Sequence, residues 1–162
     1  MPKRPPLFLG DNGPEELGDS DYLAAKAGVL FGSDTAAANV LSDYEEGDWT
    51  PMLPHGGTLT IGSAKYIKIG RQVTVNCYIT GITPAAVDAF FLIGGLPFNC
   101  GPAFASVVIG YNGTSTLISW TAYVEWYSTV IYMYASGVMI TNNAYIAAGG
   151  NPTLILTATY FV

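Results

Sequence analysis

The stretch "RQVTVNCYITGI", Arg71–Ile82, alternates apolar and polar side chains with a period of two. The apolar set is Val73, Val75, Cys77 and Ile79, and the second set is Thr74, Asn76, Tyr78 and Thr80. Successive side chains of a β-strand point to opposite faces of the sheet, so this pattern predicts a strand with one buried face. We therefore expect the surrounding chain to supply both its neighbouring strands and its core.

Segments of the same kind recur on both sides of this stretch, separated by Gly, Pro and Asn. They are "TLTIG" (58–62), "KYIKIG" (65–70), "FFLIGG" (90–95), "FASVVIG" (104–110), "TLISWTAYVEWY" (116–127), "VIYMYAS" (130–136) and "TLILTATYFV" (153–162). Turn signals follow one another at intervals of about 8 to 12 residues, and no amphipathic helix fits between them. The sequence therefore predicts an all-β fold, an antiparallel β-sandwich or jelly-roll-like head.

The segment from Trp120 to Tyr134 is apolar or aromatic on both of its predicted faces. Trp120, Val124 and Trp126 share one parity, while Tyr123 and Tyr127 share the other. An antiparallel strand with two such faces does not simply meet water on either side. One face is expected to fill the sandwich. The other is expected to form a subunit interface, the commoner use of aromatic stripes, or a platform on which glycans stack.

Charge is scarce and unevenly placed along the 162-residue chain. Charged residues make up 11% of it, against about 25% in typical soluble proteins. Residues 1–48 hold ten acids and three bases, a net charge of −7, whereas residues 49–162 hold two acids and three bases, a net charge of +1. So little charge predicts that other copies of the chain cover part of the surface. The change in composition at Trp49 predicts a domain boundary there.

The residues before this boundary lack a core of their own. Residues 1–27 are predicted to form an extended arm, because "PKRPPLFLGDNGP" (2–14) contains four prolines and two glycines. "SDYLAAKAG" (20–28) and "SDTAAANVL" (33–41) predict short helices that are marginal in isolation. We expect this arm to be docked on a larger body. Residues 28–48 form the predicted neck, and residues 49–162 form the predicted head.

The predicted head lacks the residues that catalysis and nucleic-acid binding usually require. Asp88 and Glu125 are its only carboxylates after Trp49 and lie far apart in sequence, whereas a glycosidase needs two in one cleft. His55, the only histidine, lies in the glycine-flanked "LPHGGT" (53–58), which is typical of a solvated turn. Three basic residues are too few for a nucleic-acid footprint, and no apolar run reaches the roughly 18 residues of a membrane span. We expect no enzyme activity, no cofactor, no nucleic acid and no membrane insertion.

The two cysteines give no framework for a metal or for a set of disulfides. Cys77, Cys100 and His55 lack the close spacing of zinc ligands. Cys77 is expected to pack as a small apolar residue, and Cys100 follows "LPFN" in a predicted turn. A disulfide between the two cysteines stays open as an alternative.

The acidic stretch "LSDYEEGDWTP" (41–51) joins the two parts of the chain. Its carboxylates are Asp43, Glu45, Glu46 and Asp48, and their spacing does not match an EF-hand loop, which leaves a non-standard calcium site as an alternative. The favoured interpretation is a turn at Glu46–Gly47, with Trp49 inserted into the head. The carboxylates are expected to face three basic side chains of the same or a neighbouring chain, those of Lys65, Lys68 and Arg71.

Four motifs in this order carry a resemblance to a known family. They are "DYEEGDWTP" (43–51), "KYIKIGRQVTV" (65–75), "GLPF" (95–98) and the closing "TATYFV" (157–162). Together with the lead-in from Gly28, they resemble the C-terminal domain of tail-fibre and related virion proteins of tailed bacteriophages. The chain departs from the family pattern at Asp48, where Thr is usual, and it has no long shaft before residue 28. A stubby fibre, spike or tip subunit is therefore expected.

The resemblance implies a homotrimeric head on a virion appendage, which binds a host-surface receptor such as a polysaccharide. The expected virion-docking residues of the arm are Leu7, Phe8 and Leu9, and those of the neck and trimer interface are Phe31, Tyr44 and Trp49. The expected receptor-binding residues lie in or next to turn-like segments and are Tyr111, Asn112, Tyr127, Asn142, Asn143 and Tyr145. A non-receptor virion protein, such as a capsid decoration spike or a tail adaptor, is the main alternative. A capsule-degrading enzyme is the third.

Overall fold

The computed structural model describes residues 8–10, 13–15, 43–113, 117, 119–149 and 153–162. The chain divides into two compact units, Met1–Val40 and Leu41–Val162. In the first unit, β1 (Phe8–Gly10) pairs antiparallel with β2 (Gly13–Glu15), so Phe8 and Leu9 lie on a strand. Leu7, Phe31 and both predicted helices lie outside the described residues.

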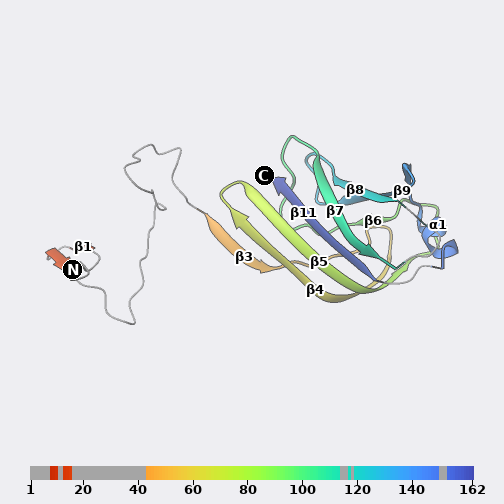
Figure 1. The fold of residues 1–162 in the computed structure, drawn as a ribbon, viewed down its shortest axis with the longest axis horizontal. Helices are drawn as coiled ribbons and strands as arrows, with labels where there is room; N and C mark the ends of the chain where they lie inside the picture. Colours follow the sequence, from red (N-terminus) through yellow and green to blue (C-terminus); the bar gives the residue numbers. More distant parts are fainter. Residues whose placement is uncertain (1–7, 11–12, 16–42, 114–116, 118, 150–152) are drawn as a thin grey trace. The chain divides into compact units, whose positions relative to one another are not determined.

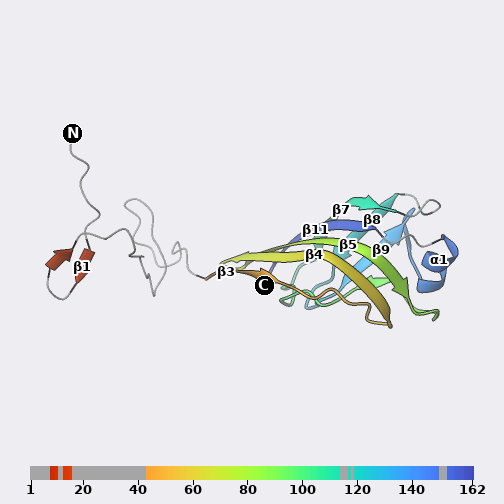
Figure 2. The ribbon, with the colours of Figure 1, turned by 90° about the horizontal axis from the view of Figure 1, so that it is seen from below.

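The second unit is built on one antiparallel sheet of nine strands. The strands are β3 (Tyr44–Asp48), β4 (Gly57–Ile69), β5 (Gln72–Pro84), β6 (Leu92–Ile93), β7 (Ala105–Asn112), β8 (Trp120–Val124), β9 (Ile131–Ala135), β10 (Val138–Met139) and β11 (Leu154–Phe161). Their order is β10-β9-β8-β7-β11-β5-β4-β3, and β6 also pairs with β9. Figures 1 and 2 show how strongly this sheet curls. The predicted antiparallel all-β class is confirmed.

The second layer of the predicted sandwich is not a sheet in the described part of the chain. Connecting segments and one helix close the open side of the curled sheet instead. Met52 and Gly94 exchange two main-chain hydrogen bonds of 3.0 and 2.8 Å, which join the segment after β3 to the segment after β6. Helix α1 (Asn142–Ala147) begins after the N-cap Thr141, whose hydroxyl accepts the Ala144 N–H. The expectation that no helix interrupts the strands was therefore wrong.

The core lies on the concave side of the sheet, and β5 runs through its middle. The four predicted inward side chains of β5, Val73, Val75, Cys77 and Ile79, are all fully buried. Strand β11 repeats the alternation beside it, with Leu156 and Tyr160 fully buried. Each of the buried Val, Ile and Leu side chains among them contributes about 1.5–3 kcal/mol through removal from water. The prediction of a strand with one buried face is confirmed at every position of β5 that it named.

Trp49 closes this core from the segment that follows β3. Its side chain is 6% exposed, and its indole N–H donates to the Asn76 carbonyl at 3.2 Å. Its main-chain N–H donates to the Ala64 carbonyl, also at 3.2 Å. A buried indole with a satisfied N–H supplies a large apolar surface without leaving a polar group unpaired. The predicted insertion of Trp49 into the head is confirmed.

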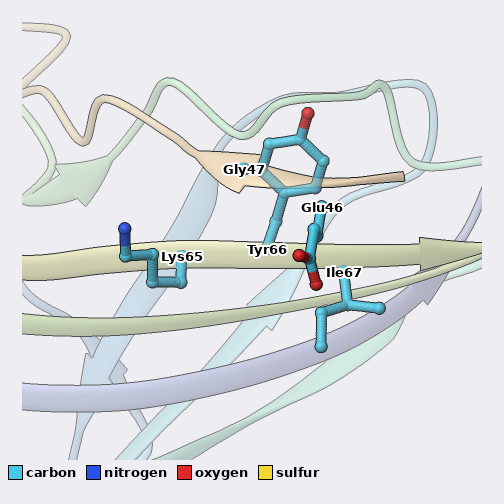
Figure 3. Close-up of a pocket in the computed structure, with 5 residues that line it drawn as sticks. All are labelled: Glu46, Gly47, Lys65, Tyr66 and Ile67. Carbon is cyan, nitrogen blue, oxygen red and sulfur yellow. The ribbon is translucent and has the colours of Figure 1, made fainter. Parts of the chain in front are cut away.

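The predicted turn at Glu46–Gly47 was wrong, because both residues lie inside β3. This strand pairs with β4 from Tyr44 opposite Ile69 to Asp48 opposite Lys65. Gly47 is needed for a different reason: a Cβ atom there would lie 3.0 Å from Cε1 of the Tyr66 ring. Figure 3 shows this ring lying beside Gly47. The glycine thus lets an aromatic ring cross the edge strand.

We expect Trp49→Ala to lower the free energy of unfolding by about 3–5 kcal/mol, because it removes a buried indole from the core. Trp126→Ala is a matched control, since Trp126 is 53% exposed. This control should change the free energy by no more than about 0.5 kcal/mol. Urea unfolding followed by circular dichroism measures both. Equal effects of the two substitutions would contradict the placement of Trp49.

Candidate functional site

Six aromatic side chains gather on the side of the sheet that faces away from the core. Phe104 precedes β7, Tyr123 lies on β8, and the turn after β8 carries two more rings. The alternation along β9 places Ile131 and Met133 in the core and the tyrosines between and after them on the opposite side. We call this set the aromatic strip: Phe104, Tyr123, Trp126, Tyr127, Tyr132 and Tyr134.

The rings of the strip form one connected series of contacts. Tyr123 is at its centre, because it stacks on Tyr132 with a centroid distance of 5.3 Å and an interplanar angle of 6°. The ring centroids of Tyr134 and Phe104 lie 5.8 and 5.5 Å from the centroid of Tyr123. The ring centroids of Phe104 and Trp126 are 6.2 Å apart, and those of Trp126 and Tyr127 are 5.9 Å apart. Cross-strand pairing fixes the centre of the strip, since Tyr123 lies directly opposite Tyr132.

The strip remains open to solvent at its Phe104 end. Phe104, Trp126 and Tyr127 are 63%, 53% and 68% exposed, whereas the three β-strand tyrosines are half-buried. Isolated exposed apolar residues are common, whereas connected exposed rings are typical of surfaces that contact a ligand or a partner. The core does not need these rings, so their gathering needs another explanation.

Hydrogen bonds and one carboxylate give the strip a polar component. A hydrogen bond to Glu125, followed by burial, raises the pKa of the Tyr132 hydroxyl. A hydrogen bond with Tyr134, followed by burial, raises the pKa of Tyr123. The raised pKa values keep the hydroxyls of Tyr123 and Tyr132 neutral over the physiological pH range. Rings, neutral hydroxyls and a single carboxylate can together bind a molecule that has both C–H faces and hydroxyl groups.

The carboxylates of the β3 edge already have partners in the same chain. Asp48 pairs with Lys65 at 2.5 Å, and Asp43 pairs with Lys68, as the sequence led us to expect for these lysines. The Lys68 ammonium also lies 5.6 Å from the centroid of the Phe98 ring. Tyr66 donates its hydroxyl hydrogen to Glu45. These contacts explain the acidic run as part of the packing of β3 against β4.

A hollow of about 390 Å³ lies at the same edge. Its lining residues are Glu46, Gly47, Lys65, Tyr66 and Ile67. Glu46 accepts a hydrogen bond from Tyr44, and Lys65 is paired with Asp48, so its two charged groups are engaged. Within the described residues, no three His, Cys, Asp or Glu side chains lie together as a metal site. We therefore assign this hollow to the architecture of the sheet edge.

The predicted receptor-binding residues do not form one site. Tyr127 belongs to the aromatic strip. Tyr111, 53% exposed, and Asn112 lie at the opposite end of β7 from Phe104. Seven steps of extended chain separate Phe104 from Tyr111, which is about 23 Å at the usual strand rise. A single saccharide unit cannot contact both ends.

Two of the predicted residues on α1 are buried and must be withdrawn from the surface. Tyr145 is 1% exposed, and its ring stacks on Phe91 with centroids 4.4 Å apart. Burial raises the pKa of Tyr145 to about 12. Asn142 is 2% exposed and donates its side-chain N–H to the Ala85 carbonyl. The sequence predicts a turn at Asn142 and Asn143, but this pair begins helix α1, which directs Tyr145 into the core. Of the three expected receptor-binding residues on α1, Asn143 is the one that is exposed.

Sequence reasoning did not select Phe104, Tyr123, Trp126, Tyr132 or Tyr134 as binding residues. The signal that could have found most of them was the two-sided aromatic pattern of residues 120–134, which indicated a subunit interface or a glycan platform. Selection by turn propensity favoured loops instead. Phe104 carries no such signal, because only the pairing of β7 with β8 brings it to Tyr123.

The remaining sequence candidates occupy ordinary structural positions. Cys77 and Cys100 are buried free thiols, and burial raises the pKa of Cys77 to about 12. His55 is exposed in a turn that the Gly56 N–H closes on the Leu53 carbonyl. Among the described residues, no helix has the length and apolar character that crossing a membrane requires.

Comparison with known proteins gives no further assignment. No family model matches the chain, and no significant match was found among curated proteins or solved structures.

Proposed function

We propose that Leu41–Val162 is the head of a bacteriophage virion appendage and that it binds a host-surface saccharide through the aromatic strip. The connected, exposed rings of the strip are the observation that carries this proposal. The virion assignment rests on the resemblance of the motifs at residues 43–51, 65–75 and 95–98 to phage fibre heads. In this proposal residues 1–27 dock the protein on the virion.

The chemistry of the strip suits a sugar better than a charged or purely apolar ligand. The face of an aromatic ring is negative, so it attracts the C–H groups on the face of a pyranose. Phe104 and Trp126 offer such faces in the most exposed part of the strip. Glu125 and the hydroxyls of Tyr123 and Tyr132 can exchange hydrogen bonds with sugar hydroxyls. Rings fixed by cross-strand pairing lose little conformational entropy on binding.

We further propose that the head is a homotrimer. The outward side of the sheet exposes a separate apolar patch around Ile155, which lies directly opposite Tyr78 on β5 and Tyr111 on β7, with Val108 further along β7. Ile155, Tyr78, Tyr111 and Val108 are 36%, 41%, 53% and 65% exposed, and such a patch on a weakly charged domain suits contact with another copy. Three heads per appendage would also compensate for weak single sites through avidity.

Light scattering coupled to size-exclusion chromatography should give three times the monomer mass of 17.1 kDa. Val108→Lys should shift this mass towards the monomer, because it places charge in the apolar patch. Val138→Lys is the matched control, because Val138 is 69% exposed and lies on β10, at one end of the strand order. A monomeric wild-type protein would contradict the trimer while leaving the strip untouched.

The second candidate function is a structural virion protein that touches no receptor. The same exposed rings favour it if they are covered by another virion protein. The two functions differ in one respect that can be measured, because only the first requires the isolated protein to bind saccharides.

We expect the wild-type protein to bind a subset of bacterial surface saccharides on a glycan array. A Phe104→Ala, Trp126→Ala double variant should lose at least about tenfold in affinity, which corresponds to about 1.4 kcal/mol. The loss follows from removing the two rings that join the ends of the strip. Tyr111→Ala is the matched control, because it removes an equally exposed ring at the other end of β7.

Thermal unfolding must show that the double variant keeps its fold. Equal binding by the wild type and a folded double variant would remove the strip from the site. Absence of saccharide binding by the wild type, with incorporation into particles, would favour the structural candidate.

A further inference from the structure

A second hollow opens next to the aromatic strip, on the same outward side of the sheet. Its volume is about 470 Å³, within the range of about 300–1,000 Å³ that is usual for small-molecule sites. Its side-chain walls include Arg71, Phe104, Ser106, Thr159 and Phe161. Phe104 belongs both to the strip and to this hollow, and Ser106 lies opposite Tyr123 on the neighbouring strand. A ligand that stacks on the strip can therefore continue into the hollow. We call it the Arg71 hollow.

Arg71 is the one described cation that is not in an ion pair with an acidic side chain. Lys65 pairs with Asp48 and Lys68 pairs with Asp43, and these are the ion pairs in the described part of the chain. Arg71 uses its Nε–H to bond the Val162 main-chain oxygen at 2.7 Å. A guanidinium has five N–H donors, so this bond leaves its two terminal nitrogens for another acceptor.

The bond to Val162 also fixes the orientation of the guanidinium. Arg71 follows Gly70 in the turn between β4 and β5, and the Val162 N–H bonds back to the Arg71 carbonyl at 2.9 Å. The pair of bonds joins this turn to the end of β11. A guanidinium held in this way is prepared for a planar, bidentate partner at little further entropic cost.

The other walls of the hollow have the chemistry of a sugar site. Phe104 and Phe161 are 63% and 59% exposed and offer apolar surface. The Ser106 and Thr159 side chains are also exposed, and each carries a hydroxyl that can donate or accept. Thr159 already shares a hydrogen bond of 3.0 Å with Thr74, so its hydroxyl is held in place.

We propose that the Arg71 hollow binds an acidic sugar unit and that its carboxylate is held by the terminal nitrogens of Arg71. This inference rests on the proposed function and specifies its ligand: an acidic saccharide whose adjacent units stack on the strip. A carboxylate matches the guanidinium fork in both geometry and charge. The apolar walls and hydroxyls then face the ring of the same sugar.

The surrounding charges make this a short-range interaction. Residues 43–162 hold six acids and three bases, a net charge of −3, so the domain does not attract an anion over long distances. Asp43, which precedes β3, accepts the Gly70 N–H with its main-chain oxygen and pairs its carboxylate with Lys68. Glu125 is engaged with Tyr132. Preference for an acidic sugar should therefore depend on Arg71 itself.

An array that carries each acidic oligosaccharide beside its carboxyl-reduced counterpart tests the inference. The full-length protein should bind at least one acidic form at least about tenfold more tightly than the reduced form. Arg71→Gln should abolish this difference and leave binding of the reduced form unchanged. Lys65→Gln is the matched control: it removes one positive charge at the same sheet but should keep the acidic preference. The preference should also decrease as the salt concentration rises.

Phe161→Ala keeps the test valid if Arg71→Gln weakens the fold. It removes an apolar wall that faces the sugar ring but keeps Arg71 and every ring of the strip, so it should lower binding of the acidic form; unchanged binding would place the acidic unit outside the hollow. Sulfated counterparts on the same array show whether a planar carboxylate is required. Equal binding of acidic and reduced forms, or a preference that survives Arg71→Gln, would overturn the inference while the proposed function stands. No binding of any saccharide would overturn both.

Discussion

The strict alternation of side chains along β5 is the constraint on which the rest of the head depends. This strand lies between β4 and β11, and its inward residues Val73, Val75, Cys77 and Ile79 are fully buried. A shift of one residue would exchange its two faces and place Thr74 and Asn76 in the core. The same register sets the outward side, where Thr74 bonds Thr159 and Asn76 bonds Thr157, each at 3.0 Å.

This division of faces also leaves the outward side chains free of any role in the core. The core is completed on the concave side by Trp49, by connecting segments and by Tyr145 of α1. The rings of the outward side are consequently free for contact with other molecules. Carboxylates near β3 are engaged by tyrosines and lysines, which leaves Arg71 as the distinctive charge beside the strip. In the proposed function, the shape and hydrogen bonds of this surface select the saccharide. Several heads that bind together raise the overall affinity through avidity.

The sequence was sufficient for the class of the fold, for β5 and for the burial of Trp49, because each depends on local alternation or on one large apolar residue. It failed where pairing between distant segments decides the outcome. Gly47 indicated a turn, yet glycine is needed there because the Tyr66 ring of β4 leaves no room for a Cβ atom. Asn142 also indicated a turn, yet Thr141 caps a helix there. The sandwich was expected from the number of short strands and the spacing of their turns, and neither says whether strands form two sheets or one curled sheet.

The same reason explains why one of the expected receptor-binding residues lies in the aromatic strip and the others do not. Tyr127 was found because it lies in a turn, whereas Phe104 and Tyr123 meet only through the pairing of β7 with β8. The aromatic pattern of residues 120–134 predicted large rings on both faces of this segment. The sequence could not show that the strip lies next to Arg71, because Arg71 and Phe104 are 33 residues apart and only the pairing of the strands brings them together.

The central claim is that the aromatic strip is the saccharide-binding surface. Nuclear magnetic resonance of the protein with labelled aromatic rings, titrated with the array saccharide that binds most tightly, tests it most directly. The account predicts shifts of the Phe104, Tyr123 and Trp126 ring signals, with the Tyr111 and Tyr78 signals unchanged. Shifts confined to Tyr111 or Tyr78, or no shift of the strip under saturating saccharide, would contradict it.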